Sequence, residues 1–199
     1  MPFTLDPELT ELTGPNGGVV WELERGGVPL LSVDYRLAPE YSGTALVDDG
    51  HAALTWLAAR AADFDVDPAR IAVMGDSGGG GVAAGVAITA RDAGVAVAKQ
   101  LLIYPMLDDR TVDPDAELDG LTSWSYDNNF TGWDAVFGDS RGSADVPARA
   151  APARLTDFVG LAPAFIDVGE LDIFRDESIR YARNLLLAGV STELYVRPG

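Results

Sequence analysis

Short apolar segments alternate with segments of helix-forming residues along most of this chain. The apolar runs have the length of buried strands, and they are residues 28–33, 71–74, 101–104, 165–168 and 192–196. The segments with helix-forming composition are residues 52–62, 78–91 and 174–188. Such alternation predicts βαβ units, which build a mostly parallel sheet covered by helices on both faces. We therefore expect an α/β fold in which residues 1–199 form a single domain.

Aromatic and apolar residues of the C-terminal half are distributed in two different ways. Residues 108–157 interrupt the alternation and indicate an irregular insertion, which we expect to lie over one end of the sheet. Its aromatic residues follow neither a helical nor a strand period, and they are Trp124, Tyr126, Phe130 and Trp133. Residues 174–188, by contrast, are amphipathic, and Gly189 is placed to end that helix. The predicted apolar face consists of Ile179, Ala182, Leu186 and Leu187.

The chain is strongly acidic and contains no cysteine. Its 31 Asp and Glu residues against 14 Lys and Arg residues give a net charge of −17, which repels phosphate backbones and excludes nucleic acid as a partner. The missing cysteines exclude disulfides, zinc thiolate sites and a cysteine nucleophile. The first residues lack the basic and apolar regions of a secretory signal, and no apolar run approaches the ~20 residues of a membrane span. We therefore expect a cytoplasmic protein.

One match to the pattern Gly-x-Ser-x-Gly lies where a strand would turn sharply into a helix. Residues 71–74 supply the apolar strand, and the helical segment 78–91 follows. Glycines on both sides of Ser77 avoid clashes in so tight a turn, and the serine hydroxyl is exposed at its tip. A second match, residues 138–142, has neither a convincing strand before it nor a good helix start after it. Ser77 is therefore the candidate nucleophile, and we expect Ser140 to be a loop serine.

The glycine-rich start of this helix has a second interpretation, a cradle for phosphate. Residues 78–81 lack the Lys-Ser/Thr pair of a P-loop, and their spacing does not give Gly-x-Gly-x-x-Gly with a useful acid downstream. We therefore prefer an oxyanion site. The backbone N–H groups at the start of the helix, that of Gly78 above all, point to where an oxyanion would form.

Four segments together resemble the hormone-sensitive-lipase-like carboxylesterases. They are Asp-Tyr-Arg-Leu-Ala-Pro-Glu at residues 34–40, Gly-Asp-Ser-Gly-Gly-Gly at 75–80, Leu-Ile-Tyr-Pro-Met-Leu-Asp-Asp at 102–109 and Val-Gly-Glu-Leu-Asp-Ile-Phe-Arg-Asp-Glu at 168–177. Alanine is common in that family where Gly78 stands. The resemblance extends over residues 21–199. It implies an α/β-hydrolase fold, hydrolysis of short to medium acyl esters, and neither a cofactor nor a metal.

The resemblance places the acid of the catalytic triad at Asp172. A carboxylate after the strand 165–168 lies at the same edge of a parallel sheet as Ser77, where such sites form. The order of serine before acid along the chain also agrees. The alternative is that Asp172 is one of several surface acids in this segment, beside Asp167, Glu170 and Asp176.

Arg36 belongs to the segment 34–40 that carries part of the resemblance. We expect it to form a buried ion pair with Asp34 or Glu40. Such a pair shapes a loop, and we prefer this role to a direct part in catalysis.

Two features of that family have no counterpart in this sequence. The His-Gly-Gly-Gly segment that supplies further oxyanion-hole N–H groups is absent, and the nearest glycine cluster, residues 14–18, reads as a flexible turn. The general-base histidine follows the last strand in the family, whereas this chain ends at Gly199. The only histidine, His51, falls at a non-catalytic position of the pattern. We expect an incomplete fold that lacks the first strands, the N-terminal cap and the C-terminal segment with the histidine.

These observations favour a carboxylic ester hydrolase that acts through Ser77 on a small-molecule ester by way of an acyl-enzyme. One alternative is a catalytically inactive binding or regulatory protein of the same fold, and another is amide or lactone hydrolysis at the same site. A sheet without its first strands leaves an open apolar edge, so we also expect a homo-oligomer or self-association.

Overall fold

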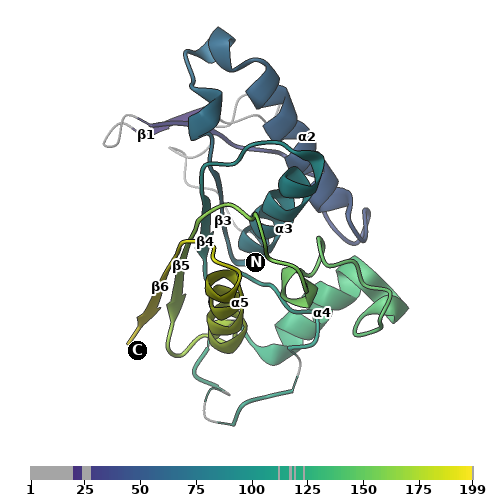
Figure 1. Ribbon diagram of the computed structural model, residues 1–199. Coiled ribbons are helices and arrows are strands. Elements are labelled where there is room, and N and C mark those ends of the chain that lie inside the picture. The colour runs from purple at the N-terminus through teal and green to yellow at the C-terminus, as the bar shows by residue number, and fades with distance from the viewer. Residues whose placement is uncertain are drawn as a thin grey trace.

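A four-stranded parallel sheet forms the centre of the molecule (Figure 1). The computed structural model describes residues 20–23, 28–111, 113–116, 118, 120–122 and 124–198. The strands follow one another across the sheet in chain order, and they are β3 (Val73–Asp76), β4 (Gln100–Ile103), β5 (Ala164–Gly169) and β6 (Thr192–Arg197). The prediction of a parallel sheet from the apolar runs is thus confirmed.

Four α-helices accompany this sheet, and none of them is both long and apolar enough to cross a membrane in the part of the chain described here. They are α2 (Ala45–Ala59), α3 (Ser77–Ala93), α4 (Tyr126–Phe137) and α5 (Arg175–Leu187). Single turns of 3₁₀ helix lie at Ala61–Phe64, Pro68–Arg70, Gly138–Ser140 and Pro152–Arg154. Helix α2 packs against α3, and α3 and α5 pack against the strands.

The helices that contact the sheet lie on one of its faces, not on both as expected. Helix α3 packs against β3 and β4, α5 packs against β5 and β6, and both lie on the same side of the strands in Figure 1. Each new strand is added on the same side of the last one, and right-handed crossovers then place every connecting helix on one face. Among the described residues, the opposite face carries the exposed Met74 and Tyr195 and the half-buried Phe165.

The segment 28–33 does not join this sheet as a further parallel strand. Instead β2 (Val28–Leu31) pairs antiparallel with β1 (Val20–Leu23), and the two form a separate two-stranded sheet. An apolar run indicates a strand but not its pairing partner, and a neighbour close in sequence costs little entropy to reach. Within the described residues, the outer edge of β3 therefore carries no partner strand.

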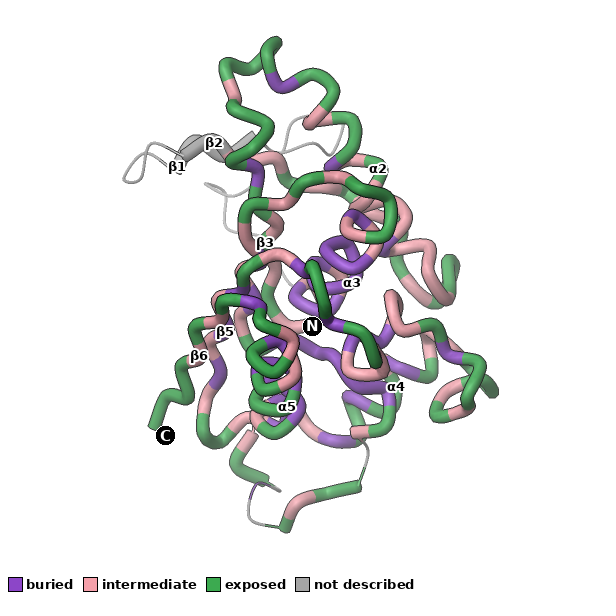
Figure 2. The backbone as a smooth tube through the Cα atoms, in the orientation of Figure 1, coloured by how far each residue is buried: buried purple, intermediate pink, exposed green. Residues whose placement is uncertain are grey.

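The main core lies between the sheet and the two helices that cover it, as the buried segments in Figure 2 show. Leu102 of β4 and Ile166 of β5 are fully buried, and they pack with Ala84 of α3 and with Tyr181 and Leu185 of α5. Burial alternates along β5, as a strand covered on one face requires. The core therefore fixes the positions of both helices relative to the strand ends.

Helix α4 lies in the insertion that was expected to be irregular. Two of the four aromatic residues do follow a helical period, because Tyr126 and Trp133 share one buried face with Asn129, whereas Phe130 is exposed. The side-chain oxygen of Ser125 caps the helix by accepting the N–H of Asn128 at 3.2 Å. Asn, Asp, Thr and Gly are poor helix formers, so packing rather than propensity holds this helix, and the pattern was missed for that reason.

Helix α5 is present as predicted, but the face that it buries is different. The buried residues are Glu177, Ser178, Tyr181, Ala182 and Leu185. Of the residues expected inside, Ile179, Leu186 and Leu187 are exposed. The buried face includes a carboxyl and a hydroxyl side chain, so apolarity alone identified the wrong stripe of this helix.

Candidate active site

Ser77 lies at a sharp turn between strand β3, which ends at Asp76, and helix α3, which begins at Ser77. Its φ angle is +50°, in the left-handed region that non-glycine residues rarely adopt. A Cβ atom on Gly75 would lie 2.1 Å from the carbonyl oxygen of Gly79, so only glycine fits at that position. The structure thus has the strand, turn and helix that the sequence pattern predicted around this serine, and such strained backbone is typical of functional sites.

The loop after β4 holds this turn in place. The backbone N–H of Met106 donates to the carbonyl oxygen of Ser77 at 2.9 Å. Helix α3 approaches this loop so closely that a Cβ atom on Gly81 would lie 2.2 Å from the carbonyl oxygen of Met106. A Cβ atom on Gly80 would lie 2.9 Å from the Cβ atom of Pro105. Glycines in the first turn of α3 therefore permit the contact that supports the serine turn.

Gly78, the second residue of α3, is exposed beside Ser77. The first N–H groups of a helix have no acceptor within the helix, so this N–H is suited to an oxyanion. An apolar pocket of about 120 Å³ adjoins Gly78. Its lining includes Leu37, Gly81, Val82, Met106, Trp133 and Val136. The pocket walls come from the segment 35–47, from α3, from the loop after β4 and from α4, so helix α4 contributes to the site.

Asp172 lies in the turn between β5 and α5. One of its carboxylate oxygens accepts the N–H of Phe174 at 2.8 Å, which orients the group. Burial raises the pKa of Asp172, and the hydrogen bond from Phe174 opposes that rise. A partly buried, oriented carboxylate of this kind differs from the exposed acids nearby, such as Asp176.

Ser77 and Asp172 follow the carboxyl ends of β3 and β5, which flank β4 in the sheet. Two strand spacings separate these ends, about 10 Å, which leaves room for an imidazole between the two side chains. His51, the only histidine in the sequence, lies on α2 instead. Its Nε2 atom is buried without a hydrogen-bond partner among the described residues.

Ser140 does not share the geometry of Ser77. It ends a single 3₁₀ turn, Gly138–Ser140, that follows helix α4 directly, and it is exposed. The element directly before this turn is therefore a helix and not a strand. Of the two Gly-x-Ser-x-Gly matches, the one at Ser77 alone lies between a strand and a helix.

Arg36 pairs with Asp49 rather than with Asp34 or Glu40, and the pair is partly exposed rather than buried. Two guanidinium nitrogens donate to Asp49 at 2.8 and 2.7 Å, and the backbone N–H of Arg36 donates at 3.0 Å. These hydrogen bonds lower the pKa of Asp49 to about 2. Asp49 lies in the first turns of α2, so the tertiary fold brings it within reach of a segment 13 residues away.

The loop that Arg36 anchors also places Tyr35 over the serine turn. A Cβ atom on Gly79 would lie 3.8 Å from the hydroxyl of Tyr35, and Tyr35 lines the apolar pocket. Burial raises the pKa of Tyr35, and the nearby Asp76 adds to the rise, so its hydroxyl keeps its proton. The Arg36–Asp49 pair therefore has a positional effect on the pocket wall.

Comparison with known proteins agrees with this geometry. A family model described as the alpha/beta hydrolase fold matches residues 23–199. The chain belongs to the α/β-hydrolase fold family.

The relatives of this α/β-hydrolase confirm the resemblance to carboxylesterases. Carboxylesterase NlhH of Mycobacterium tuberculosis is 40% identical over 176 residues, which are 85% of this chain and 54% of the relative. Ethyl acetate hydrolase of Pseudomonas putida is 33% identical over 195 residues, with 90% and 57% covered. The solved structure of a bacterial heroin esterase superposes with a TM-score of 0.78 at 43% identity, covering 85% of this chain and 55% of that one. The chain thus spans about half the length of the curated relatives it matches.

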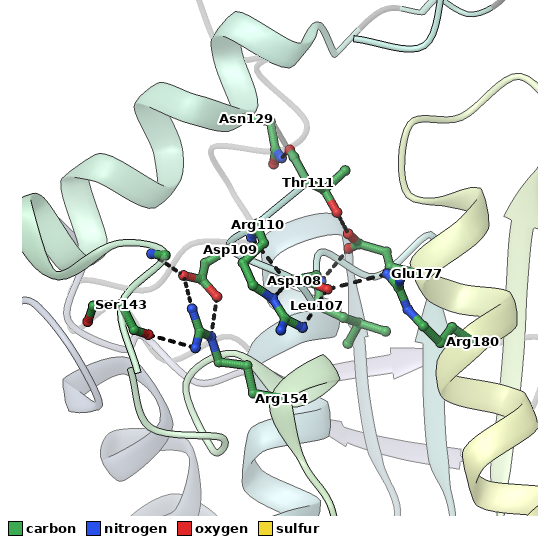
Figure 3. Close-up of polar contacts among 11 residues, drawn as sticks. Leu107, Asp108, Asp109, Arg110, Thr111, Asn129, Ser143, Arg154, Glu177 and Arg180 are labelled. Carbon is green, nitrogen blue, oxygen red and sulfur yellow. Dashed lines mark hydrogen bonds and ion pairs between the residues drawn. The ribbon is translucent and has the colours of Figure 1, made fainter. Parts of the chain in front are cut away.

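The most densely connected polar groups of this α/β-hydrolase were not singled out from the sequence (Figure 3). Asp109 is fully buried, and Arg154 donates to it through two nitrogens at 2.5 and 2.8 Å. Burial alone would raise the pKa of Asp109, but the hydrogen bonds from Arg154 and from the Gly142 N–H outweigh it and lower the pKa. Asp108 pairs with Arg110 and Arg180. Two consecutive aspartates, Asp108 and Asp109, follow the apolar run 101–104, and this pair was the sequence signal that could have indicated the buried ion pairs.

Glu177 is the third buried acidic residue that sequence reasoning missed, after Asp108 and Asp109. It is 1% exposed and accepts the Leu107 N–H and the Thr111 hydroxyl, each at 2.6 Å. Burial raises its pKa to about 8. Among the described residues, no three His, Cys, Asp or Glu side chains gather as ligands for a metal ion, and these acids are occupied by arginines and backbone amides instead.

Proposed function

We propose that this chain carries the nucleophile and the triad acid of a carboxylic ester hydrolase. The observation that carries the proposal is Ser77 at φ +50° between β3 and α3, at the carboxyl edge of the parallel sheet and beside an apolar pocket. The names of the relatives, carboxylesterase and ethyl acetate hydrolase, support the same chemistry. Short to medium acyl esters are the proposed substrates.

The proposed reaction is acyl transfer through a covalent intermediate. The Ser77 hydroxyl oxygen attacks the ester carbonyl carbon while a histidine base takes the hydroxyl proton, and the carbonyl oxygen becomes an oxyanion. The Gly78 N–H donates to that oxyanion. Collapse breaks the bond to the alcohol oxygen, which leaves with the proton from the base. Water then attacks the acyl-serine by the same steps, and releases the acid.

Asp172 orients the base in this scheme and stabilises its protonated form. The support is its place after β5, its hydrogen bond from Phe174 and its partial burial. His51 has no role in the proposed mechanism. It lies on α2, and its Nε2 atom is buried without a hydrogen-bond partner in the described part of the chain. A base supplied from solution can replace a histidine side chain, and this makes the mechanism testable on the 199-residue chain.

The pocket supports a short acyl group as the preferred substituent. It is small and mostly apolar, so a short alkyl chain fills it without burying a polar group unpaired. Its wall includes Trp133 and Val136 of α4 and Met106 beside the serine turn. An inactive binding protein of this fold is the alternative, and the hydrolase names of the relatives do not favour it.

The test is hydrolysis of 4-nitrophenyl acetate, measured with and without added imidazole. Imidazole alone hydrolyses this ester, so the protein-free rate at the same imidazole concentration is subtracted from every measurement. We expect imidazole to accelerate the remaining turnover in the wild-type chain, and Ser77→Ala to abolish that acceleration. Ser140→Ala, in the other Gly-x-Ser-x-Gly match, is the matched control and should leave it unchanged. Turnover that survives Ser77→Ala would exclude this serine as the nucleophile. Turnover that is lost on His51→Ala, in a protein that still folds, would show that His51 is the base after all.

A further inference from the structure

Two consecutive backbone amides connect the serine turn with helix α5. The N–H of Met106 donates to the carbonyl oxygen of Ser77 at 2.9 Å. The N–H of the next residue, Leu107, donates to a carboxyl oxygen of Glu177 at 2.6 Å. The loop after β4 is therefore held on one side by the nucleophile turn and on the other by a side chain of α5.

Helix α5 in turn begins directly after the turn that carries Asp172. The carbonyl oxygen of Asp172 accepts the N–H of Arg175, the first residue of α5, and its carboxylate accepts the N–H of Phe174. Phe174 is buried in the same apolar cluster as Met106. Glu177 lies in the first turn of this helix. A shift of α5 along its axis would therefore move Asp172 and the loop after β4 together.

The second oxygen of the Glu177 carboxyl group extends the contact to the insertion (Figure 3). It accepts the hydroxyl of Thr111 at 2.6 Å, and the carbonyl oxygen of Thr111 accepts the side-chain amide of Asn129 on α4. Asn129 is fully buried on the face of α4 that also carries Trp133. The Glu177 carboxyl group thus contacts the loop after β4, which supports the serine turn. Through Thr111 it is also connected to helix α4, which lines the pocket.

We propose that Glu177 is a positioning residue that holds the Ser77 turn, the Asp172 turn and helix α4 in one fixed arrangement. It touches neither the substrate nor the reacting atoms. It acts through the amide of Leu107 and the hydroxyl of Thr111. This role rests on the proposed function for its catalytic consequence, whereas its mechanical part concerns the described residues alone.

A merely structural role is the competing interpretation, because any buried carboxyl group that loses its partners destabilises a fold. Leu185→Ala provides the matched control, since Leu185 is fully buried on the same helix but its apolar side chain makes no hydrogen bond to the loop after β4. Glu177→Gln provides the conservative variant. Its amide keeps an oxygen for the Leu107 N–H and a second polar atom for Thr111, whereas Glu177→Ala removes both.

The first measurement is amide hydrogen exchange by NMR at pH 7, read at single residues. In Glu177→Ala we expect at least tenfold faster exchange at Leu107, at Met106 and at Phe174, all relative to the β5 core. Glu177→Gln should match the wild type within a factor of about three, and Leu185→Ala should accelerate exchange throughout the core without this selective pattern. Faster exchange at Leu107 alone, with Met106 and Phe174 unchanged, would overturn the proposal.

The second measurement is imidazole-assisted hydrolysis of 4-nitrophenyl acetate. Glu177→Ala should lower kcat at least tenfold with KM nearly unchanged, and Glu177→Gln should restore kcat. Leu185→Ala should lose activity only in proportion to its unfolded fraction. If the wild type shows no Ser77-dependent turnover, the proposed function fails, and the exchange pattern still decides the positioning role. Equal kcat in the Ala and Gln variants would refute the catalytic consequence.

Discussion

Replacing Glu177 with glutamine should flatten the pH dependence of stability between pH 5 and pH 8. Burial raises the pKa of Glu177 from 4.5 to about 8 in the folded chain. Above pH 4.5 the unfolded chain releases this proton while the folded chain keeps it, so the free energy of unfolding falls as the pH rises. One pKa unit corresponds to about 1.4 kcal/mol, so about 5 kcal/mol is lost by the time the folded group ionises near pH 8.

Urea unfolding followed by circular dichroism at pH 5, 6, 7 and 8 measures this effect. The wild-type free energy of unfolding should fall by about 1.4 kcal/mol per pH unit relative to Glu177→Gln, whose side chain cannot ionise. All other titratable groups are the same in both proteins and cancel in the comparison. Asp108, whose charge adds to the raised pKa of Glu177, is also unchanged.

Glu193→Gln is the control, because Glu193 is an exposed carboxylate paired with Lys99 on the surface. Its stability curve should run parallel to that of the wild type. If the wild type and Glu177→Gln lost stability in parallel over the whole range, Glu177 would be ionised in the folded chain. The reasoning from burial would then be refuted.

Three further outcomes test other parts of the structure. Gly75→Ala should destabilise the chain by about 3 kcal/mol or more in urea, because its Cβ would collide with the Gly79 carbonyl oxygen. Gly78→Ala should not destabilise the chain, because its Cβ would meet no atom within 4 Å beyond its chain neighbours and the backbone of its own helix. Asp109→Asn should cost about 3 kcal/mol in the same assay, because it removes the fully buried carboxylate that pairs with the mostly buried Arg154. Asp49→Asn, in a partly exposed pair, should leave the urea midpoint nearly unchanged. Light scattering should detect self-association, because the described chain exposes both the outer edge of β3 and one apolar face of the sheet, and a monodisperse monomer at micromolar concentration would contradict that expectation.

Local sequence determined the strands and the serine turn. Short apolar runs specify extended, buried backbone whatever their partners, so β3 to β6 lie within two residues of where they were expected. The turn at Ser77 also follows from its neighbours, because glycine at position 75 is the residue that admits so close an approach to Gly79. Asp172 was placed by the resemblance to carboxylesterases rather than by local sterics, and its position after β5 agrees with the shared edge of parallel strands.

Tertiary structure alone decided which polar groups are buried and which elements meet. Arg36 pairs with Asp49, which is 13 residues away, and Glu177 accepts the N–H of Leu107, which is 70 residues away. No local sequence pattern encodes contacts between residues so far apart in the chain. Helix α4 forms from poor helix formers because Tyr126 and Trp133 have a surface to pack on. Features that depend on short-range sterics and hydrophobicity, such as strands and tight turns, can therefore be predicted from the sequence. The partners of a carboxylate, and hence its charge, depend on contacts that exist only once the chain has folded.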